Sequence, residues 1–311
     1  MNTVIELSEL TKNYGSRRGL TELSLQVNAG EVLGYLGPNG AGKSTTIRLM
    51  LGFIRPTSGV LRVLGVDPRA DADDVHRRIG YLAGDFLVDS RQRAGECLAF
   101  LGNLRGGVPA QRIGELADRL ELDLSARIKS LSKGNRQKVG LVQAFMHRPE
   151  LLILDEPTSG LDPLMQQTFL EMVTEARDHG QTVFMSSHIM NEVESVADRV
   201  AIIRDGRLIA TDTVAGLRAR SLLRVQIEFA APVAPEEFAA LPGITDLTLT
   251  STAQGALLTC RLDGSPDALV KAAARHTINA LRADNQDLEE LFHAYYTGEH
   301  SAQDAETNPI A

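Results

Sequence analysis

One short segment constrains this chain more than any other, because it defines a loop that binds phosphate groups. Residues 37–45 read Gly-Pro-Asn-Gly-Ala-Gly-Lys-Ser-Thr, which satisfies the G-x-x-x-x-G-K-[ST] pattern at every fixed position. The apolar run 31–36 before it predicts a buried strand, and residues 45–51 after it predict a helix. This strand–loop–helix context favours a true phosphate loop over a glycine-rich turn that fits the pattern by chance.

Each residue type in the segment has a role in holding a nucleotide. Glycines allow the backbone to pass close to the phosphates with its N–H groups directed inward, and the helix N-terminus adds partial positive charge. Lys43 supplies a mobile charge for the β- and γ-phosphates, and the Ser44 hydroxyl is placed to ligate Mg²⁺. The predicted nucleotide-binding residues of the loop are Gly37, Pro38, Asn39, Gly40, Ala41, Gly42, Lys43, Ser44 and Thr45.

Composition and charge narrow the class of protein. The chain has 311 residues, of which 43% are apolar and 23% charged, and this predicts a globular chain that is soluble when isolated. The formal net charge of −8 argues against wrapping a nucleic-acid backbone, so no nucleic-acid partner is expected. Cys97 and Cys260 are far apart and lack metal-ligand spacing. No apolar run is long enough to cross a bilayer, so a membrane role is expected only through a partner.

The order of predicted elements indicates an α/β fold with a second, smaller domain. Strand patterns dominate residues 1–30 and helical patterns dominate about 86–146. Elsewhere, short apolar strands alternate with helices, which predicts a mostly parallel sheet flanked by helices. We therefore expect a P-loop NTPase core over residues 1–220, with an antiparallel β subdomain and a helical subdomain. Residues 222–300 predict a small C-terminal α+β domain resembling a split βαβ sandwich, and residues 301–311 a disordered tail.

Two adjacent carboxylates, Asp155 and Glu156, follow the apolar run 151–154. Ligand sites in such sheets lie at the carboxyl ends of the strands, which places both side chains at the predicted nucleotide edge. Asp155 is placed to hold the water shell of Mg²⁺, and Glu156 to polarise an attacking water as general base. The alternative is a solvated acidic turn, which the phosphate loop upstream in the same sheet disfavours.

Three further segments carry weaker signals. Ser132 and the Gly134 N–H group precede a predicted helix, an arrangement that forms either an anion site or an ordinary helix cap. His188 follows the next apolar strand, and its position beside the strand that bears Glu156 favours a functional role over a structural one. Tyr14 lies in a polar turn, where its ring is able to stack on a flat base.

In this set and order, the motifs resemble those of the nucleotide-binding subunit of an ABC transporter. The resemblance implies an ATP hydrolase with Mg²⁺, in which Tyr14 stacks on adenine, residues 37–45 are Walker A, and residues 152–156 are Walker B with the catalytic Glu. Residues 222–300 are similar, more loosely, to the C-terminal part of many bacterial ABC-2 type exporter ATPases. The other implied site residues are the signature residues Ser132, Lys133, Gly134 and Asn135, the D-loop residue Asp162, and the switch residue His188, catalytic together with Glu156.

Two segments depart from the family pattern. In the signature, which is usually L-S-G-G-Q, Lys133 and Asn135 stand in place of a glycine and the glutamine. Gly84 stands where the family has Gln or Glu, a side chain that normally touches Mg²⁺ and relays the nucleotide state to the membrane partner. Asp85 is the substitute metal ligand that the sequence offers, one position further on and shorter.

The resemblance also implies how the chain assembles. Two copies face head to tail, so that each ATP lies between Walker A of one copy and Ser132 and Gly134 of the other. The implied partners are therefore a second copy of this chain and a separate transmembrane permease subunit, which places the chain peripherally at the cytoplasmic face of the cell membrane. Export is favoured over import through the looser C-terminal resemblance alone.

Other classes of protein remain as alternatives. A soluble ABC-type ATPase not coupled to transport, acting on ribosomes or DNA, is disfavoured by the single cassette, the lack of a heptad run and the acidic charge. A P-loop kinase or GTPase gives no role to the Ser132 segment or His188, and no N-K-x-D motif for guanine is present. A regulatory module without turnover is disfavoured by Glu156 and kept open by Gly84.

Overall fold

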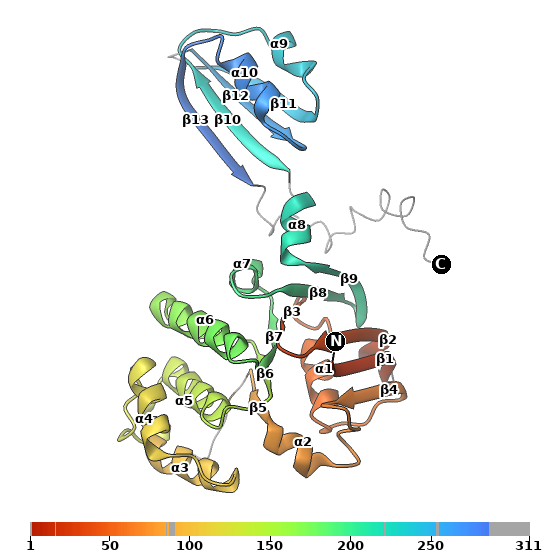
Figure 1. Cartoon of the computed structure of the whole chain (residues 1–311), viewed down its shortest axis with the longest axis vertical. Helices are drawn as coiled ribbons and strands as arrows, with labels where there is room; N and C mark the ends of the chain where they lie inside the picture. The colour runs from red at the N-terminus through yellow and green to blue at the C-terminus, as the bar shows by residue number, and fades with distance from the viewer. Residues whose placement is uncertain are drawn as a thin grey trace. The chain divides into compact units, whose positions relative to one another are not determined.

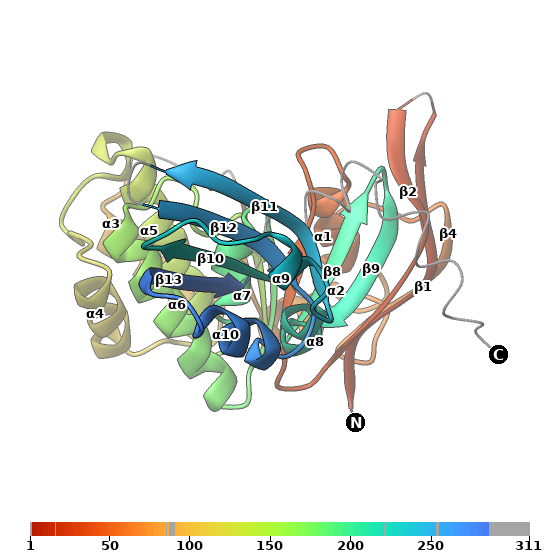
Figure 2. The ribbon, with the colours of Figure 1, turned by 90° about the horizontal axis from the view of Figure 1, so that it is seen from above.

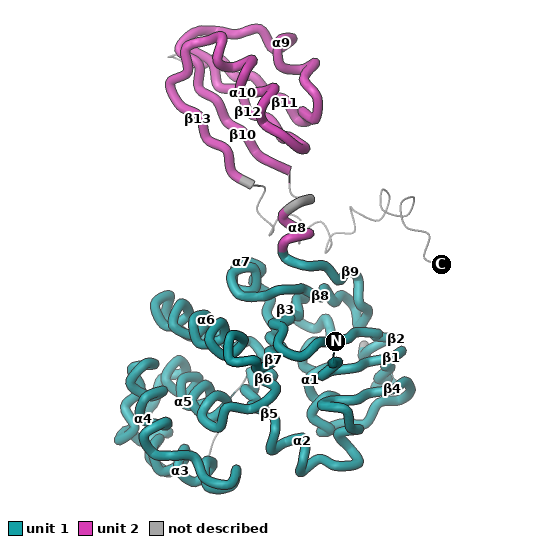
Figure 3. The backbone as a smooth tube through the Cα atoms, in the orientation of Figure 1, with its two compact units in different colours: residues 1–214 teal, residues 215–311 magenta. Residues whose placement is uncertain are grey.

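The chain folds into two compact units, residues 1–214 and 215–311, which are described separately (Figure 3). No helix in the described part of the chain is long and apolar enough to cross a membrane. The computed structural model describes residues 2–15, 17–84, 86, 91–220, 222–252 and 255–285.

Unit 1 combines two sheets with helices (Figure 1). Its strands are β1 (Thr3–Tyr14), β2 (Arg17–Asn28), β3 (Val32–Leu36), β4 (Ser58–Val63), β5 (Ile79–Leu82), β6 (Leu151–Asp155), β7 (Thr182–Ser187), β8 (Arg199–Arg204) and β9 (Arg207–Thr213). Its helices are α1 (Lys43–Met50), α2 (Ala72–Arg78), α3 (Ala94–Leu104), α4 (Ala110–Arg119), the 3₁₀ turn η1 (Ile128–Ser130), α5 (Lys133–Phe145), α6 (Pro163–Asp178) and α7 (Met190–Glu194).

The larger sheet of unit 1 is mostly parallel and has the order β5-β6-β7-β3-β8-β9, in which only the β8–β9 pair is antiparallel. Every residue of β3, β6 and β7 is buried, as expected for central strands covered on both faces. The smaller sheet is antiparallel with the order β2-β1-β4. It lies at one end of unit 1, and α3 and α4 lie at the other (Figures 1 and 2).

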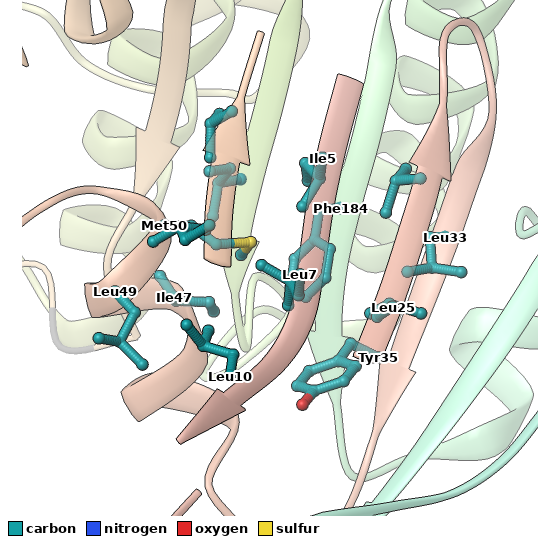
Figure 4. Close-up of a cluster of buried hydrophobic side chains, with 14 of the residues drawn as sticks. Ile5, Leu7, Leu10, Leu25, Leu33, Tyr35, Ile47, Leu49, Met50 and Phe184 are labelled. Atoms are coloured by element: carbon teal, nitrogen blue, oxygen red, sulfur yellow. The ribbon is translucent and has the colours of Figure 1, made fainter. Parts of the chain in front are cut away.

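One buried cluster joins both sheets to α1 and so fixes the helix that follows the phosphate loop (Figure 4). The Tyr35 and Phe184 rings lie 5.0 Å apart between centroids. The Tyr35 hydroxyl is hydrogen-bonded to the Thr46 hydroxyl on α1 at 3.1 Å, and burial raises the pKa of Tyr35. Each large apolar side chain that is fully buried here stabilises the fold by about 1.5–3 kcal/mol. Members of the cluster include Ile5, Leu7, Leu10, Leu25, Leu33, Ile47, Leu49 and Met50.

Unit 2 has the element order β-α-β-β-α-β after α8 (Val214–Arg220), which begins at the unit boundary. Its sheet has the order β11-β12-β10-β13 with antiparallel neighbours throughout, which is the split βαβ arrangement. The predicted α/β class with an α+β appendix is therefore confirmed. Residues 286–300 of that predicted domain and the tail 301–311 lie outside the described residues. The elements are β10 (Leu223–Phe229), α9 (Glu236–Ala239), β11 (Ile244–Thr252), β12 (Gly255–Leu262), α10 (Asp267–Ala273) and β13 (Ile278–Asn285).

Candidate functional site

The parallel register of the larger sheet brings three of the predicted motifs to one edge. Leu36 pairs with Ser187 across β3 and β7, and Asp155 pairs with Ser186 across β6 and β7. The carboxyl ends of these three strands therefore lie side by side, as the rule for ligand sites in parallel sheets requires. The phosphate loop leaves β3 at this edge, Glu156 leaves β6, and His188 leaves β7.

The phosphate loop, residues 37–45, forms the turn between β3 and α1. Gly37 approaches the neighbouring backbone so closely that a Cβ atom there would lie 2.6 Å from the Ile203 carbonyl oxygen. Lys43 is the first residue of α1 and is buried, with Nζ donating to the Gly37 carbonyl at 2.5 Å. Ser44 is exposed at the same end of the helix. A lysine and a hydroxyl thus share one helix N-terminus, which favours anions.

Glu156 lies at the centre of the site, between the lysine of the loop and the histidine of β7. Its Oε1 is 3.1 Å from Lys43 Nζ. The two atoms form an ion pair, but the angles at this contact do not meet those of a hydrogen bond. Its Oε2 accepts a hydrogen bond from His188 Nδ1 at 2.7 Å. Because an ionised carboxylate only accepts, this contact requires the proton of His188 to be on Nδ1. Glu156 adopts φ = 47°, a left-handed conformation that is rare outside glycine and typical of strained functional sites.

Asp155 is buried and held by a serine on the next strand. Its Oδ1 accepts from the Ser186 hydroxyl at 2.6 Å, and the same hydroxyl accepts from the Glu156 N–H at 3.1 Å. On the open side of Asp155 lies Gly84, where a Cβ atom would be 3.6 Å from Oδ2. Asp85, the predicted substitute metal ligand, lies outside the described residues. In the described part of the chain, no group of three or more His, Cys, Asp or Glu side chains could hold a metal ion by itself.

The signature segment begins α5 and is joined to the turn that follows Glu156. The Ser132 hydroxyl caps the helix by accepting from the Asn135 N–H at 3.2 Å. The Lys133 ammonium donates to the Ser159 hydroxyl at 3.1 Å. A Cβ atom on Gly134 would lie 2.4 Å from the carbonyl oxygen of Gly160, so only glycine permits this approach.

Among the described residues, the signature residues contact the turn that follows Glu156 rather than the Lys43–Glu156–His188 cluster, and Tyr14 and Asp162 contact neither. Tyr14 ends β1 and is 41% exposed, and the Lys12 ammonium lies 5.1 Å from the centre of its ring. Asp162 caps α6 by accepting from the Met165 N–H at 3.0 Å. Their predicted roles toward ATP remain predictions.

Sequence reasoning missed Glu192, on α7. Its Oε2 accepts from the Thr158 hydroxyl at 2.8 Å and from the Ser187 hydroxyl at 3.1 Å. Burial, and to a smaller extent the nearby Glu156 charge, raise the pKa of Glu192. This carboxylate therefore connects the turn after β6 to the end of β7, beside His188. No spacing in the sequence indicated this contact, because α7 begins at Met190, after His188, and the partner Thr158 is 34 positions away.

Comparisons with known proteins agree with this geometry. The sequence pattern of a family described as "ABC transporter" matches residues 20–159. The daunorubicin/doxorubicin resistance ATP-binding protein DrrA of Streptomyces peucetius is 35% identical, over 100% of this chain and 98% of its own length. A solved ATP binding subunit of an ABC transporter is 31% identical with a TM-score of 0.66, over 70% of this chain and 92% of that one.

A second solved structure extends the comparison of the fold. It is the ATP-binding cassette MJ0796, described as dimeric and in a post-hydrolysis state bound to ADP and Pi. It is 22% identical with a TM-score of 0.60, over 68% of this chain and 98% of that one. The phosphate loop, the edge of the sheet and the whole-length similarity to DrrA lead to one assignment. The chain belongs to the ABC transporter family of ATP-binding subunits, and it is an ATP hydrolase of that family.

Proposed function

We propose that this chain binds Mg·ATP at the carboxyl edge of β3, β6 and β7 and hydrolyses it with Glu156 as the general base. The observation that carries the proposal is the position of Glu156, which lies 3.1 Å from Lys43 and 2.7 Å from His188. A base that activates water must lie beside the group that binds the γ-phosphate, and Lys43 is that group in a phosphate loop. Residues 39–45 bind the phosphates through their backbone N–H groups, and Gly37 and Pro38 shape the start of the loop.

The reaction then needs three things from the chain. Lys43 moves its ammonium from Glu156 to the phosphates, which frees Oε1. Glu156 accepts the proton of the attacking water, while the water oxygen bonds to the γ-phosphorus. The bond from that phosphorus to the bridging oxygen breaks, and ADP leaves with the electron pair. His188 holds the carboxylate in position through its Nδ1–H, and as the family's switch residue it contacts the γ-phosphate.

Residues that fit Mg²⁺ are present beside the loop. The exposed Ser44 hydroxyl would ligate the ion, and Asp155 would hold one of its waters. The Ser186 hydroxyl orients the buried Asp155 by donating to it. Metal-binding carboxylates are commonly held by hydrogen-bond donors in this way. When bound, Mg²⁺ neutralises the charge of the β- and γ-phosphates. Asp85 stays a sequence-based candidate for the same ion.

Two copies of the chain would enclose each ATP head to tail. The trans contacts are proposed for Ser132, Lys133, Gly134 and Asn135 at the N-terminus of α5, with Asp162 next to them in the D-loop. A helix N-terminus with a serine cap and an added ammonium favours an anion such as the γ-phosphate. The dimeric cassette of the same fold supports this assembly. Tyr14 is proposed to stack on the adenine of ATP bound to its own copy.

One substitution tests both the base and the dimer. Glu156→Gln keeps the size of the side chain and removes its ability to take a proton, so we expect ATP binding with loss of phosphate release. The variant with ATP should accumulate as a dimer in light scattering. Glu150→Gln is the matched control, since Glu150 pairs with Arg78 on the surface. Phosphate release by Glu156→Gln at the parent rate, or a persistent monomer with ATP, would contradict the proposal.

We further propose that the cycle powers export through a separate transmembrane subunit, at the cytoplasmic face of the membrane. The name of DrrA, a drug-resistance ATP-binding protein similar over the whole length of the chain, supports export. An exposed apolar patch suits the docking of that subunit. Phe100 and Leu104 lie one turn apart on α3 and are 54% and 66% exposed, and Phe53 is 56% exposed. The Phe53 ring meets the His76 ring edge to face, and the His76 carbonyl accepts from Arg105, the residue after Leu104.

Docking is tested with the membrane fraction of the cell that makes the chain. Leu104→Glu places a charge in the patch without touching the nucleotide site, so we expect ATPase activity to persist while membrane association falls. Val60→Glu is the control, because Val60 is 50% exposed on β4, in the smaller sheet at the other end of unit 1. Unchanged membrane association of Leu104→Glu would refute the docking surface. Co-sedimentation of the chain with ribosomes would favour the alternative, a soluble ABC-type ATPase not coupled to transport.

A further inference from the structure

A pocket of about 420 Å³ lies where the end of α3, the start of α4 and the end of α5 meet. Val108, Pro109 and Met146 form apolar parts of its wall, and the polar parts are mostly cationic. The pocket adjoins the last turn of α5, whereas the signature begins the first turn. The 13 residues of α5 span about 20 Å, so the pocket is separate from the nucleotide site.

His147 brings one unused donor to the pocket. Its Nε2 lies 2.8 Å from Arg105 Nη1, and because a guanidinium only donates, Nε2 must accept and the proton must be on Nδ1. The Ile79 carbonyl, 3.2 Å from Nε2, is satisfied by Arg105 Nη1 at 2.8 Å. Burial and the Arg105 charge lower the pKa of His147 to about 4, so the ring is neutral near pH 7. The buried Nδ1–H has no hydrogen-bond partner among the described residues.

Two arginines bring further unused donors. The Nε–H of Arg112 is buried and also lacks a partner in the described part of the chain. Its Nη1 lies 3.8 Å from Glu115, the one carboxylate in the pocket wall. The guanidinium of Arg148 makes no ion pair or hydrogen bond with a described residue and lines the same pocket. Buried donors in folded proteins are nearly always paired, so two unpaired donors in one pocket indicate a missing acceptor.

Arg105 adds a charge that no carboxylate balances. The two hydrogens of its Nη1 are shared among His147 Nε2, the Ile79 carbonyl at 2.8 Å and the His76 carbonyl at 3.1 Å, and Gln143 is able to accept from its Nη2 at 3.2 Å. These acceptors are neutral, and burial lowers the pKa of Arg105. The wall therefore holds three guanidinium groups against one carboxylate, with His147 neutral, which leaves two positive charges in excess.

We propose that this pocket is a binding site for a small organic anion, a carboxylate or phosphate ester. Its oxygens accept from the guanidinium of Arg148 and, after rotation of the two buried side chains, from Nδ1 of His147 and Nε of Arg112, and its carbon skeleton contacts the apolar wall. The anion joins α4 to the end of α5 and, through Arg105, to the carbonyl groups at the start of β5. The signature helix is thereby braced at the end opposite to its nucleotide contacts.

The His147 ring reports binding directly. The full chain, labelled with ¹³C-histidine, is titrated with succinate or with inorganic phosphate at constant ionic strength, and His147→Gln assigns the signal among the 7 histidines. We expect a saturable shift of the His147 signal and a rise of its pKa, because a bound anion stabilises the protonated ring. Phosphate held in the Walker A loop does not contact this residue, so it leaves the signal in place.

Variants decide whether the shift comes from this pocket. Arg148→Gln and Arg112→Gln should each raise the apparent Kd about tenfold, the loss expected for one charge-assisted hydrogen bond. Arg62→Gln removes the same charge from β4, outside the pocket, and should leave the Kd unchanged. A response to succinate alone, to phosphate alone or to both supports the site and selects the ligand class. No saturable shift with either anion, or an unaltered Kd in both pocket variants, would overturn the proposal.

Discussion

The ion pair between Lys43 and Glu156 makes a prediction about stability that can be separated from catalysis. In the structure, the Glu156 carboxylate is paired with the Lys43 ammonium, which is the group that binds the phosphates of ATP. The carboxylate therefore competes with the nucleotide for this ammonium. Glu156→Gln removes this competition. We expect the variant to be less stable than the parent chain without nucleotide, and to bind ATP more tightly than the parent chain does.

The size of the effect follows from the surroundings of the pair. The two side chains are only 6% and 21% exposed, and breaking a buried pair by removing one partner costs about 3–5 kcal/mol. Lys43 keeps the carbonyl acceptors of Gly37 at 2.5 Å and Pro38 at 3.4 Å, so we expect a smaller cost of about 2 kcal/mol. For a unit of this size, that lowers Tm by about 4–8 °C. The same free energy, released on ATP binding, tightens Kd up to about 30-fold.

Calorimetry and an ATP titration measure both quantities, in the absence of Mg²⁺ so that the parent chain does not turn over. Glu175→Gln is the control for losing a carboxylate, since its partner Arg119 lies at the surface and such pairs contribute at most about 1 kcal/mol. Equal Tm values for Glu156→Gln and the parent chain without nucleotide would refute the reasoning. So would an ATP affinity of the variant no tighter than that of the parent.

Neighbouring contacts give further predictions. Glu192→Ala leaves two buried hydroxyls without their shared acceptor, so it should lower the free energy of unfolding by about 2 kcal/mol. Glu192→Gln keeps an acceptor and should keep most of the stability. Urea denaturation distinguishes the two variants. Gly134→Ala drives a Cβ against the Gly160 carbonyl, and we expect kcat to fall at least about tenfold while a single copy still binds ATP, as measured by phosphate release and nucleotide titration. His147 has a pKa of about 4 when folded and near 6.5 when unfolded, so the unfolded chain binds the proton first as pH falls. The parent chain should therefore lose stability between about pH 6.5 and 4, and His147→Gln should lose less, as followed by urea midpoints across that range.

Local pattern was sufficient to predict the fold class and the edge at which the motifs meet. A phosphate loop is contiguous, so its identity depends on nine successive residues, 37–45, and on the elements beside them. The apolar run before Asp155 predicts a central strand, and parallel strands all end at one edge. The approach of Glu156 to Lys43 and His188 follows from that topology. The one long-range assumption was that the strand before His188 lies beside the strand that bears Glu156, and β6 and β7 are indeed paired.

The interactions that sequence could not predict depend on partners far apart in the chain. Glu192 accepts from Thr158, which is 34 positions away, and the pairing exists only because β6 and β7 are neighbours. The anion pocket requires Arg105 and His147, separated by 42 positions, to meet beside β5. Neither pair has a recurring spacing, and a single arginine or histidine in a helical pattern gives no indication of an unpaired donor. Such sites are identified by hydrogen-bond donors that lack an acceptor, and only a three-dimensional structure shows which donors these are.

The two departures from the family pattern have different physical consequences. Lys133 is occupied within its own copy, because its ammonium donates to Ser159 in the turn that follows Glu156. The ammonium has three N–H donors, so the bond to Ser159 leaves two of them for the phosphate of a partner's ATP. A Cβ atom on Gly84 would meet Asp155 at ordinary van der Waals distances, so an alanine there causes no steric conflict with it. A glycine has no side chain that could contact Mg²⁺, so position 84 cannot relay the nucleotide state to a membrane partner through such a contact. Among the described residues, three contacts join the turn after Glu156 to α5: Lys133 donates to Ser159, Gln137 Nε2 donates to the Pro157 carbonyl at 3.1 Å, and Gly134 lies close to Gly160.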